Sequence, residues 1–182
     1  MMRLEFLVRR AGIDTTAETT LHALRALMGI AVDAVEHGTL WRFEIAAEPE
    51  ILRVKDAIAR AACRAGRYVN LNRDVVAWLD DASVQARVAP GQFATDLWIT
   101  DGDGTDPTAA DYFARQLGKP FQQVRRGTLY RLWAEHEDAA SARAAALQVA
   151  VTRTRRQGLL MNPHAQSVEV LRVWSHRPAE DA

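Results

Sequence analysis

The strongest constraint on the fold is an internal repeat, because the chain matches itself without a gap when it is shifted by 89 positions. The clearest block is "VEHGTLWR" at 35–42 against "VRRGTLYR" at 124–131. Farther along, an offset of 92 matches Asn70 with Asn162. Self-similarity of this kind indicates that one supersecondary unit occurs twice. The 182 residues therefore divide into two units of roughly 80–90 residues each.

Both copies contain the same series of predicted elements. Strand-like runs begin and end each copy, at 3–9 and 74–79 in the first and at 95–100 and 167–174 in the second. Between the two helices of each copy, residues 30–46 and 120–135 have two extended runs flanking a glycine, which predicts a hairpin. The predicted order is β-α-β-β-α-β, twice. This order indicates an α+β fold of two tandem ferredoxin-like units, each with one sheet face packed on two helices.

The predicted helices have apolar faces with helical spacing. The residues on these faces are Leu21, Leu24 and Met28; Ile51, Val54, Ile58 and Ala62; Ala110, Phe113 and Leu117; and Ala144, Leu147 and Val151. Aromatic residues also occur on the predicted strands: Trp41, Phe43, Tyr130 and Trp133. Because the RNA-recognition signature is absent, we expect burial between the two half-sheets rather than base stacking.

The repeat suggests a division of the chain into four parts. These are a first repeat at 1–80, a linker at 81–93, a second repeat at 94–174 and a flexible tail at 175–182. A unit of about 80 residues is near the lower limit for a stable core. Because two such units can cover each other's open sheet faces, we expect an intramolecular pseudo-dimer.

The charge balance bears on the class of partner. The formal net charge is zero, whereas a general nucleic-acid binder carries a basic excess. No apolar run approaches the ~18 residues of a membrane span, and the first ten residues lack the features of a signal peptide. We therefore expect a cytoplasmic protein whose partners are other proteins, with no nucleic acid and no membrane.

The segment "DGDGTDP", residues 101–107, has three aspartates that suggest a cation site at first reading. As a calcium loop beginning at Asp101, it lacks the required glycine at position 6 and has Tyr112 where a glutamate is needed. It also lacks the Gly-Lys-Ser/Thr of a phosphate loop. The better interpretation is a helix start, with Asp106 as the N-cap and Pro107 in the first helical position. In the first copy, Thr15 and Glu18 predict a capping box at the matching place.

No arrangement of side chains indicates catalysis or a metal site, and no cofactor is expected. The histidines have no metal-ligand spacing; they are His22, His37, His136, His164 and His176. The single cysteine, Cys63, lies in an alanine-rich helical stretch and is expected to be a buried apolar residue. The arginine-rich stretch at 152–158 is interpreted as a helix end, with a phosphate or RNA contact as the less favoured alternative.

The second copy resembles the PurS family, the small subunit of phosphoribosylformylglycinamidine synthase. Four motifs carry the resemblance over 94–174: Asp106-Pro107, Leu117-Gly118, Val124-Arg125-Arg126-Gly127 and Leu159-Leu160-Met161-Asn162-Pro163. The first copy is degenerate and keeps Gly29, Val35, Gly38 and Asn70. The family usually has lysine after the hairpin glycine, where both copies have threonine, Thr39 and Thr128. If that lysine contacts a partner or a ligand phosphate, its role is lost or has moved to Arg42, Arg126 or Arg131.

The resemblance implies a non-catalytic subunit that bridges a glutaminase (PurQ-type) and an ATP-using synthetase (PurL-type) in de novo purine biosynthesis. A tandem copy is similar to a covalently linked PurS dimer, and further homodimerisation stays open. The implied partner-contact residues are Asp106, Pro107, Arg125, Arg126, Gly127, Arg131, Asn162 and Pro163. The alternative hypothesis is a divergent ferredoxin-like regulatory or small-molecule-binding module.

Overall fold

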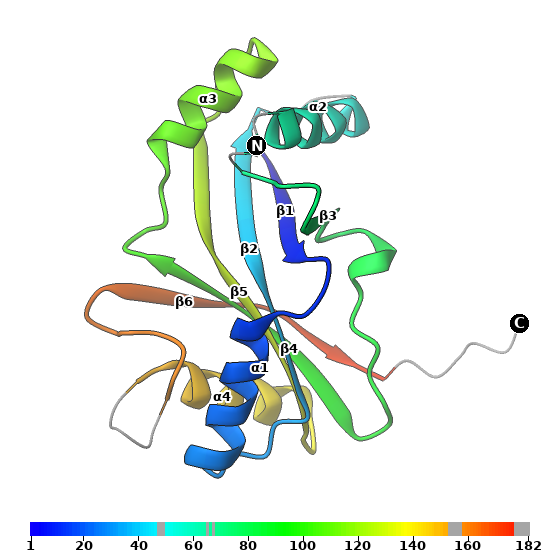
Figure 1. The fold of residues 1–182 in the computed structure, drawn as a ribbon, viewed down its shortest axis with the longest axis vertical. Helices are drawn as coiled ribbons and strands as arrows, with labels where there is room; N and C mark the ends of the chain where they lie inside the picture. Colours follow the sequence, from blue (N-terminus) through cyan, green and yellow to red (C-terminus); the bar gives the residue numbers. More distant parts are fainter. Residues whose placement is uncertain (47–49, 65, 67, 153–157, 177–182) are drawn as a thin grey trace, which may run out of the picture. The chain divides into compact units, whose positions relative to one another are not determined.

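The computed structural model describes residues 1–46, 50–64, 66, 68–152 and 158–176. It is an α+β structure with a six-stranded antiparallel sheet and four α-helices among these residues (Figure 1). The elements are β1 (Met2–Arg10), α1 (Thr15–His22), the π-helical turn η1 (Ala23–Leu27), β2 (Ala34–Ile45), α2 (Ile51–Arg64), β3 (Asp74–Trp78), the 3₁₀ turn η2 (Ala82–Val84), β4 (Gln92–Asp101), α3 (Pro107–Leu117), β5 (Gln123–Glu135), α4 (Ala139–Ala150) and β6 (Gln166–Ser175). The order strand-helix-strand-helix-strand therefore occurs twice. No helix among these residues has the length and apolar character needed to cross a membrane.

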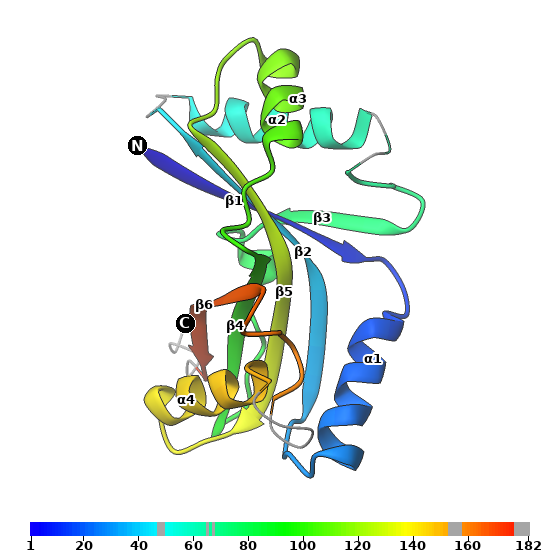
Figure 2. The same ribbon diagram turned by 90° about the vertical axis from the view of Figure 1, so that its left-hand side faces the viewer.

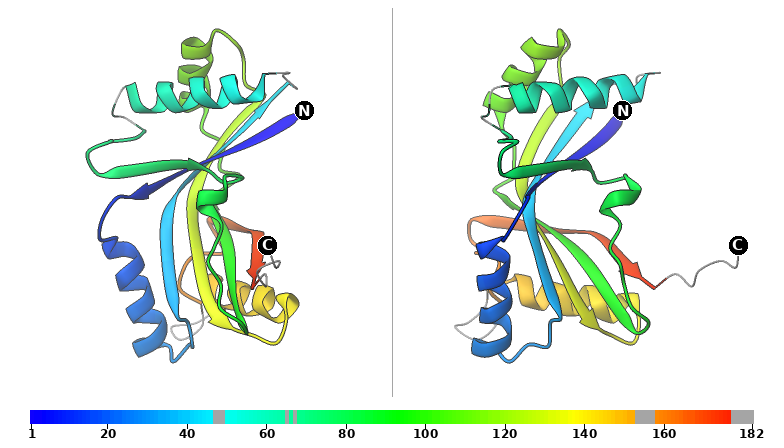
Figure 3. Two further views of the ribbon diagram at one scale, coloured as in Figure 1. Left: turned by 90° about the vertical axis from the view of Figure 1, so that its right-hand side faces the viewer. Right: turned by 45° about the vertical axis from the view of Figure 1, so that its right-hand side comes forward.

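The predicted hairpins are wrong, because each is one uninterrupted strand. Residues 34–45 form β2 and residues 123–135 form β5, and both strands continue past their glycine without interruption (Figure 3). Gly38 does not have the positive φ of a hairpin turn. A Cβ at Gly38 would lie 2.8 Å from the carbonyl oxygen of Val8 on the neighbouring strand. Glycine is needed there for close strand approach rather than for a turn.

The long strands distribute each sequence copy over two compact units. The strand order is β3-β1-β2-β5-β4-β6. Unit 1 comprises Met1–Ile13, Gly38–Val84 and Asp103–Gly127, and unit 2 comprises Asp14–His37, Gln85–Gly102 and the chain from Thr128 onward. Unit 1 thus holds α2 of the first copy with α3 of the second, and unit 2 holds α4 of the second copy with α1 of the first. The compact units and the sequence repeats are different divisions of the chain.

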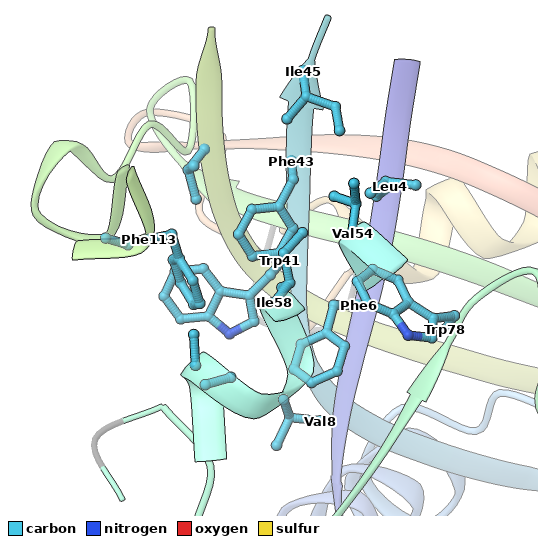
Figure 4. Packing of buried hydrophobic residues seen from close by; sticks show 14 of the residues in the cluster. Leu4, Phe6, Val8, Trp41, Phe43, Ile45, Val54, Ile58, Trp78 and Phe113 are labelled. Carbon is cyan, nitrogen blue, oxygen red and sulfur yellow. The ribbon is translucent and has the colours of Figure 1, made fainter. Parts of the chain in front are cut away.

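The core of unit 1 forms where α2 and α3 pack on one face of β1 and β2. Phe113 of α3 packs edge-on against Phe43 at 5.0 Å and against Trp41 at 6.4 Å between ring centroids (Figure 4). Val54 and Ile58 supply the apolar face of α2 in the same cluster. α2 and α3 are in contact through a hydrogen bond from the Tyr112 hydroxyl to the Ala61 carbonyl, and α3 crosses α2 in Figure 2. Two helices cover this sheet face, as predicted, but they come from different copies. Trp41 and Phe43 are therefore buried beneath helices and not between two half-sheets, as was predicted.

The core of unit 2 forms among η1, α4, β4 and β5. Leu24, in the turn that continues α1, is fully buried against Leu97 of β4 and Leu132 of β5. The buried residues of α4 are Ala142, Ala146, Val149 and Ala150. The predicted face through Ala144 is wrong, because Ala144 is exposed and Leu147 is only partly buried. A helix composed mainly of alanine has little contrast between its faces, so its periodicity is a weak guide.

The linker and tail boundaries differ slightly from the prediction. β4 begins at Gln92, inside the predicted linker, and β6 continues to Ser175, the first residue of the predicted tail. The imidazole Nδ1 of His176 lies 3.0 Å from the carbonyl oxygen of Val88. The rest of the tail and most of the arginine-rich stretch, residues 177–182 and 153–157, lie outside the described residues.

Candidate functional site

The structure divides the predicted partner-contact residues between the two units. Unit 1 contains Asp106, Pro107, Arg125, Arg126 and Gly127, and unit 2 contains Arg131, Asn162 and Pro163. The first group is close together, because the start of β5 pairs with the loop that leads into α3. The second group occupies two separate places in unit 2.

The loop before α3 is held against β5 by backbone hydrogen bonds. The amide of Asp106 donates to the carbonyl of Val124 at 2.9 Å, and the amide of Arg126 donates to the carbonyl of Gly104 at 2.7 Å. Gly104 has a φ of 77°, a left-handed conformation that glycine adopts without strain. The carboxylate of Asp103 accepts the Thr105 amide at 2.9 Å, and this hydrogen bond lowers the pKa of Asp103. The aspartates of "DGDGTDP" thus shape a loop that brings Asp106 and Arg126 to one corner of unit 1.

Asp106 and Pro107 begin α3 as predicted. The Asp106 side chain accepts the Ala109 amide at 2.9 Å and proline occupies the first turn, while Gly118 ends the helix in a left-handed conformation. In the first copy the capping box is wrong. The N-cap is Asp14, whose carboxylate accepts the amides of Thr16 and Ala17. Aspartate is at least as favourable an N-cap as threonine, and Asp14 precedes Thr15, so the helix begins one residue earlier than the predicted capping box requires.

A cavity of about 150 Å³ opens at the Asp106 corner. It is lined by Thr39, Trp41, Tyr68, Asp106 and Arg126. The Arg126 guanidinium lies over the Trp41 ring at 5.2 Å, a cation–π distance, and the Tyr68 ring meets the Trp41 ring edge-on at 5.1 Å. Asp106 and Arg126, two polar residues of the motifs in the second copy, therefore share a cavity with two aromatic residues. Sequence reasoning missed Tyr68, for which the repeat gives no signal because its match at an offset of 92 is Leu160.

Arg131 and its counterpart Arg42 have a different role, since both are buried ion-pair partners. Arg131 is 3% exposed and donates from Nε and Nη2 to the fully buried carboxylate of Asp96, at 2.5 and 2.9 Å. Arg42 is 1% exposed and pairs with Glu5 at 2.8 Å. In both cases the acid lies directly opposite the arginine on the neighbouring strand. The arginine shared by the two repeats is thus explained by cross-strand pairing inside each unit.

Asn162 forms a turn before the last strand. Its side-chain oxygen accepts the His164 amide at 3.0 Å, and its carbonyl accepts the amides of Ala165 and Gln166. Asn70 of the first copy makes the same kind of turn, accepting the Asn72 amide at 3.1 Å. The match between Asn70 and Asn162 thus reflects a local turn that starts β3 and β6.

Unit 2 has a counterpart of the Asp106 corner. At an offset of 89, Arg126 corresponds to His37 and Trp41 to Tyr130. His37 Nδ1 lies 3.0 Å from the carboxylate of Asp14, the N-cap of α1, and the His37 and Tyr130 rings are 5.2 Å apart. Burial and the nearby Asp14 charge raise the pKa of Tyr130. From the sequence, His37 was considered only as a possible metal ligand, and no suitable spacing was found. The repeat offset of 89 positions was the signal that could have matched His37 with Arg126.

The described residues contain no group of three or more His, Cys, Asp or Glu side chains placed to hold a metal ion. Cys63 is half-buried beside the unit 1 core, and burial raises the pKa of its thiol. Comparison with known proteins gives no match, either to a protein-family model or to a curated protein.

Proposed function

We propose that this chain is a PurS-like, non-catalytic subunit that bridges the synthetase and glutaminase of a phosphoribosylformylglycinamidine synthase. The observation that carries the proposal is the order of motifs in the second copy, together with the structural role of each motif residue. Asp106 and Pro107 start a helix, Gly118 ends it, and Asn162 forms the turn before the last strand. These structural roles account for the order and spacing of the motifs along the second copy.

The arrangement of strands and helices supports a finer proposal for the fold. Each unit has four neighbouring antiparallel strands and two helices, with the order β3-β1-β2-β5 in unit 1 and β2-β5-β4-β6 in unit 2. We infer that each unit is a ferredoxin-like fold completed by exchange, in which one copy supplies its first helix and half of a long strand to the other unit. An exchange of this kind is the usual way in which two copies of a fold become a swapped dimer, here within one chain.

The geometry also narrows the proposed partner contacts. Arg131, in unit 2, is buried. In unit 1, Arg126 and Pro107 are exposed and Arg125 is partly exposed. Arginine at the edge of an exposed patch pairs well with carboxylates of a partner. We therefore assign the contact with the larger enzymes to Arg125, Arg126 and the start of α3.

The direct test is reconstitution with the cognate synthetase and glutaminase, followed by glutamine-dependent turnover. We expect the three chains to co-purify and turnover to depend on this chain. Arg126→Glu should weaken co-purification, and Arg115→Glu, an exposed arginine of α3 with the same charge change, should leave it intact. Equal turnover with and without the chain would refute the proposal.

A further inference from the structure

The cavity of unit 1 carries two opposite charges that do not neutralise each other. Asp106 and Arg126 both line it, yet within the described part of the chain their side chains form no ion pair with one another. The Asp106 carboxylate accepts the Ala109 amide, and the Arg126 guanidinium lies over Trp41. In unit 2, by contrast, the aspartate that caps α1 is in direct contact at 3.0 Å with His37, which occupies the position of Arg126. The charged pair of unit 1 is therefore held apart with a cavity beside it.

The remaining lining residues suit a small organic molecule. Thr39 brings a hydroxyl group that donates or accepts hydrogen bonds, while the Tyr68 hydroxyl and the Trp41 ring are buried behind the charged groups. At about 150 Å³, the cavity is several times larger than the roughly 10–15 Å³ that one water molecule needs, which leaves room for a small organic molecule.

We propose that this cavity binds a small zwitterion of the amino-acid type. The ligand carboxylate pairs with the Arg126 guanidinium, and the ligand ammonium pairs with the Asp106 carboxylate. A simple anion fits less well, because Asp106 repels it, and a simple cation is repelled by Arg126. Only a ligand carrying both charges satisfies both side chains. The chemistry of this cavity does not depend on the proposed bridging role.

The test uses saturation-transfer NMR on the full chain with an equimolar mixture of the protein amino acids. Acetate and methylamine serve as the separate anionic and cationic halves, and inorganic phosphate is titrated by calorimetry. Arg126→Gln and Asp106→Asn remove one charge each, and asparagine keeps the N-cap of α3. Arg115→Gln, on the exposed part of α3, is the matched control.

We expect at least one amino acid to bind the wild type and the control, and each charge-removing variant to weaken that binding about tenfold or more, as expected for a lost charge-assisted hydrogen bond. Acetate and methylamine should bind far more weakly than the amino acid. The proposal is overturned if no amino acid binds, if acetate, methylamine or phosphate binds as tightly as the best amino acid, or if binding survives in both variants.

Discussion

The two units place different side chains at equivalent corners. Unit 1 has Asp106, Arg126 and Trp41 around a cavity, and unit 2 has Asp14, His37 and Tyr130. In each corner an aspartate caps the first helix of a copy, and a base and an aromatic ring come from equivalent positions of β2 and β5. The backbone roles are the same, while the acid and base touch only in unit 2.

This difference separates what the fold requires from what a site requires. The aspartate cap and the aromatic ring occur in both units, where they stabilise the start of the first helix of a copy and the packing around it. Folding does not require an arginine that is separate from the capping aspartate, because unit 2 has a histidine in direct contact with its cap at the equivalent place. The unpaired arrangement in unit 1 is thus the better candidate for function.

The largest expected effect comes from the buried residues of α3 and of the turn that continues α1. Phe113→Ala in unit 1 should lower the free energy of unfolding by about 4 kcal/mol, because the ring contacts several other aromatic rings and leaves a cavity. Leu24→Ala, at the equivalent position of unit 2, should cost about 3 kcal/mol. Urea denaturation followed by circular dichroism measures both. A larger loss for Leu24→Ala would show that the aromatic contacts of Phe113 do not make it the more stabilising of the two residues.

The second effect concerns the buried ion pairs. Asp96→Ala should cost about 3 kcal/mol, because it leaves the Arg131 charge and the Trp174 indole N–H without their buried carboxylate. Glu5→Ala should cost less, about 2 kcal/mol, because the Glu5 side chain is 16% exposed and water can reach the vacated place beside Arg42. The same urea titrations apply. Equal losses of stability in the two variants would show that water reaching the place of Glu5 does not lower the cost of leaving the Arg42 charge without its partner.

Local features of the fold follow from the sequence, whereas the distribution of each copy over two units does not. Alternating apolar residues located the strands, and Asp106-Pro107 located the start of α3. A hairpin and a straight strand share the same alternation, so the pattern around Gly38 could not reveal that β2 continues. Which copy supplies a helix to which unit depends on contacts between residues distant in sequence, and no local pattern contains that information.

The candidate site was predictable only in part, because local sequence patterns identify some of its residues and long-range contacts bring in the others. Asp106 and Arg126 stood out as members of spaced motifs, and Trp41 stood out as a strand aromatic. Tyr68 has no such signal, because it lies in an irregular segment between α2 and β3. Arg131 was misleading as a partner contact, because an arginine that alternates on a strand looks exposed until its cross-strand acid, Asp96, is known.

A smaller effect separates the two helix caps. Asp14→Ala should lower the stability by about 2 kcal/mol, because Asp14 accepts two backbone amides and also pairs with His37. Asp106→Ala should cost about 1 kcal/mol, because Asp106 accepts one amide. Thermal unfolding of the two variants against wild type provides the comparison. If the two losses are the same, the contact with His37 adds nothing to the cap.

The smallest effect is a change of ionisation at the unit 2 corner, which unit 1 cannot show because Trp41 does not ionise. The pKa of Tyr130 is raised by burial first and by the Asp14 charge second. Asp14→Asn keeps the cap and removes the charge, so it should move the pKa of Tyr130 part of the way back toward the ordinary tyrosine value near 10. The sign for stability follows from linkage: the unfolded chain loses this proton first, so stability falls as pH rises above about 10. Ultraviolet titration of wild type, Asp14→Asn and a Tyr130→Phe reference resolves the Tyr130 transition, and an unchanged midpoint in Asp14→Asn would mean that Asp14 does not act on the phenol across this corner.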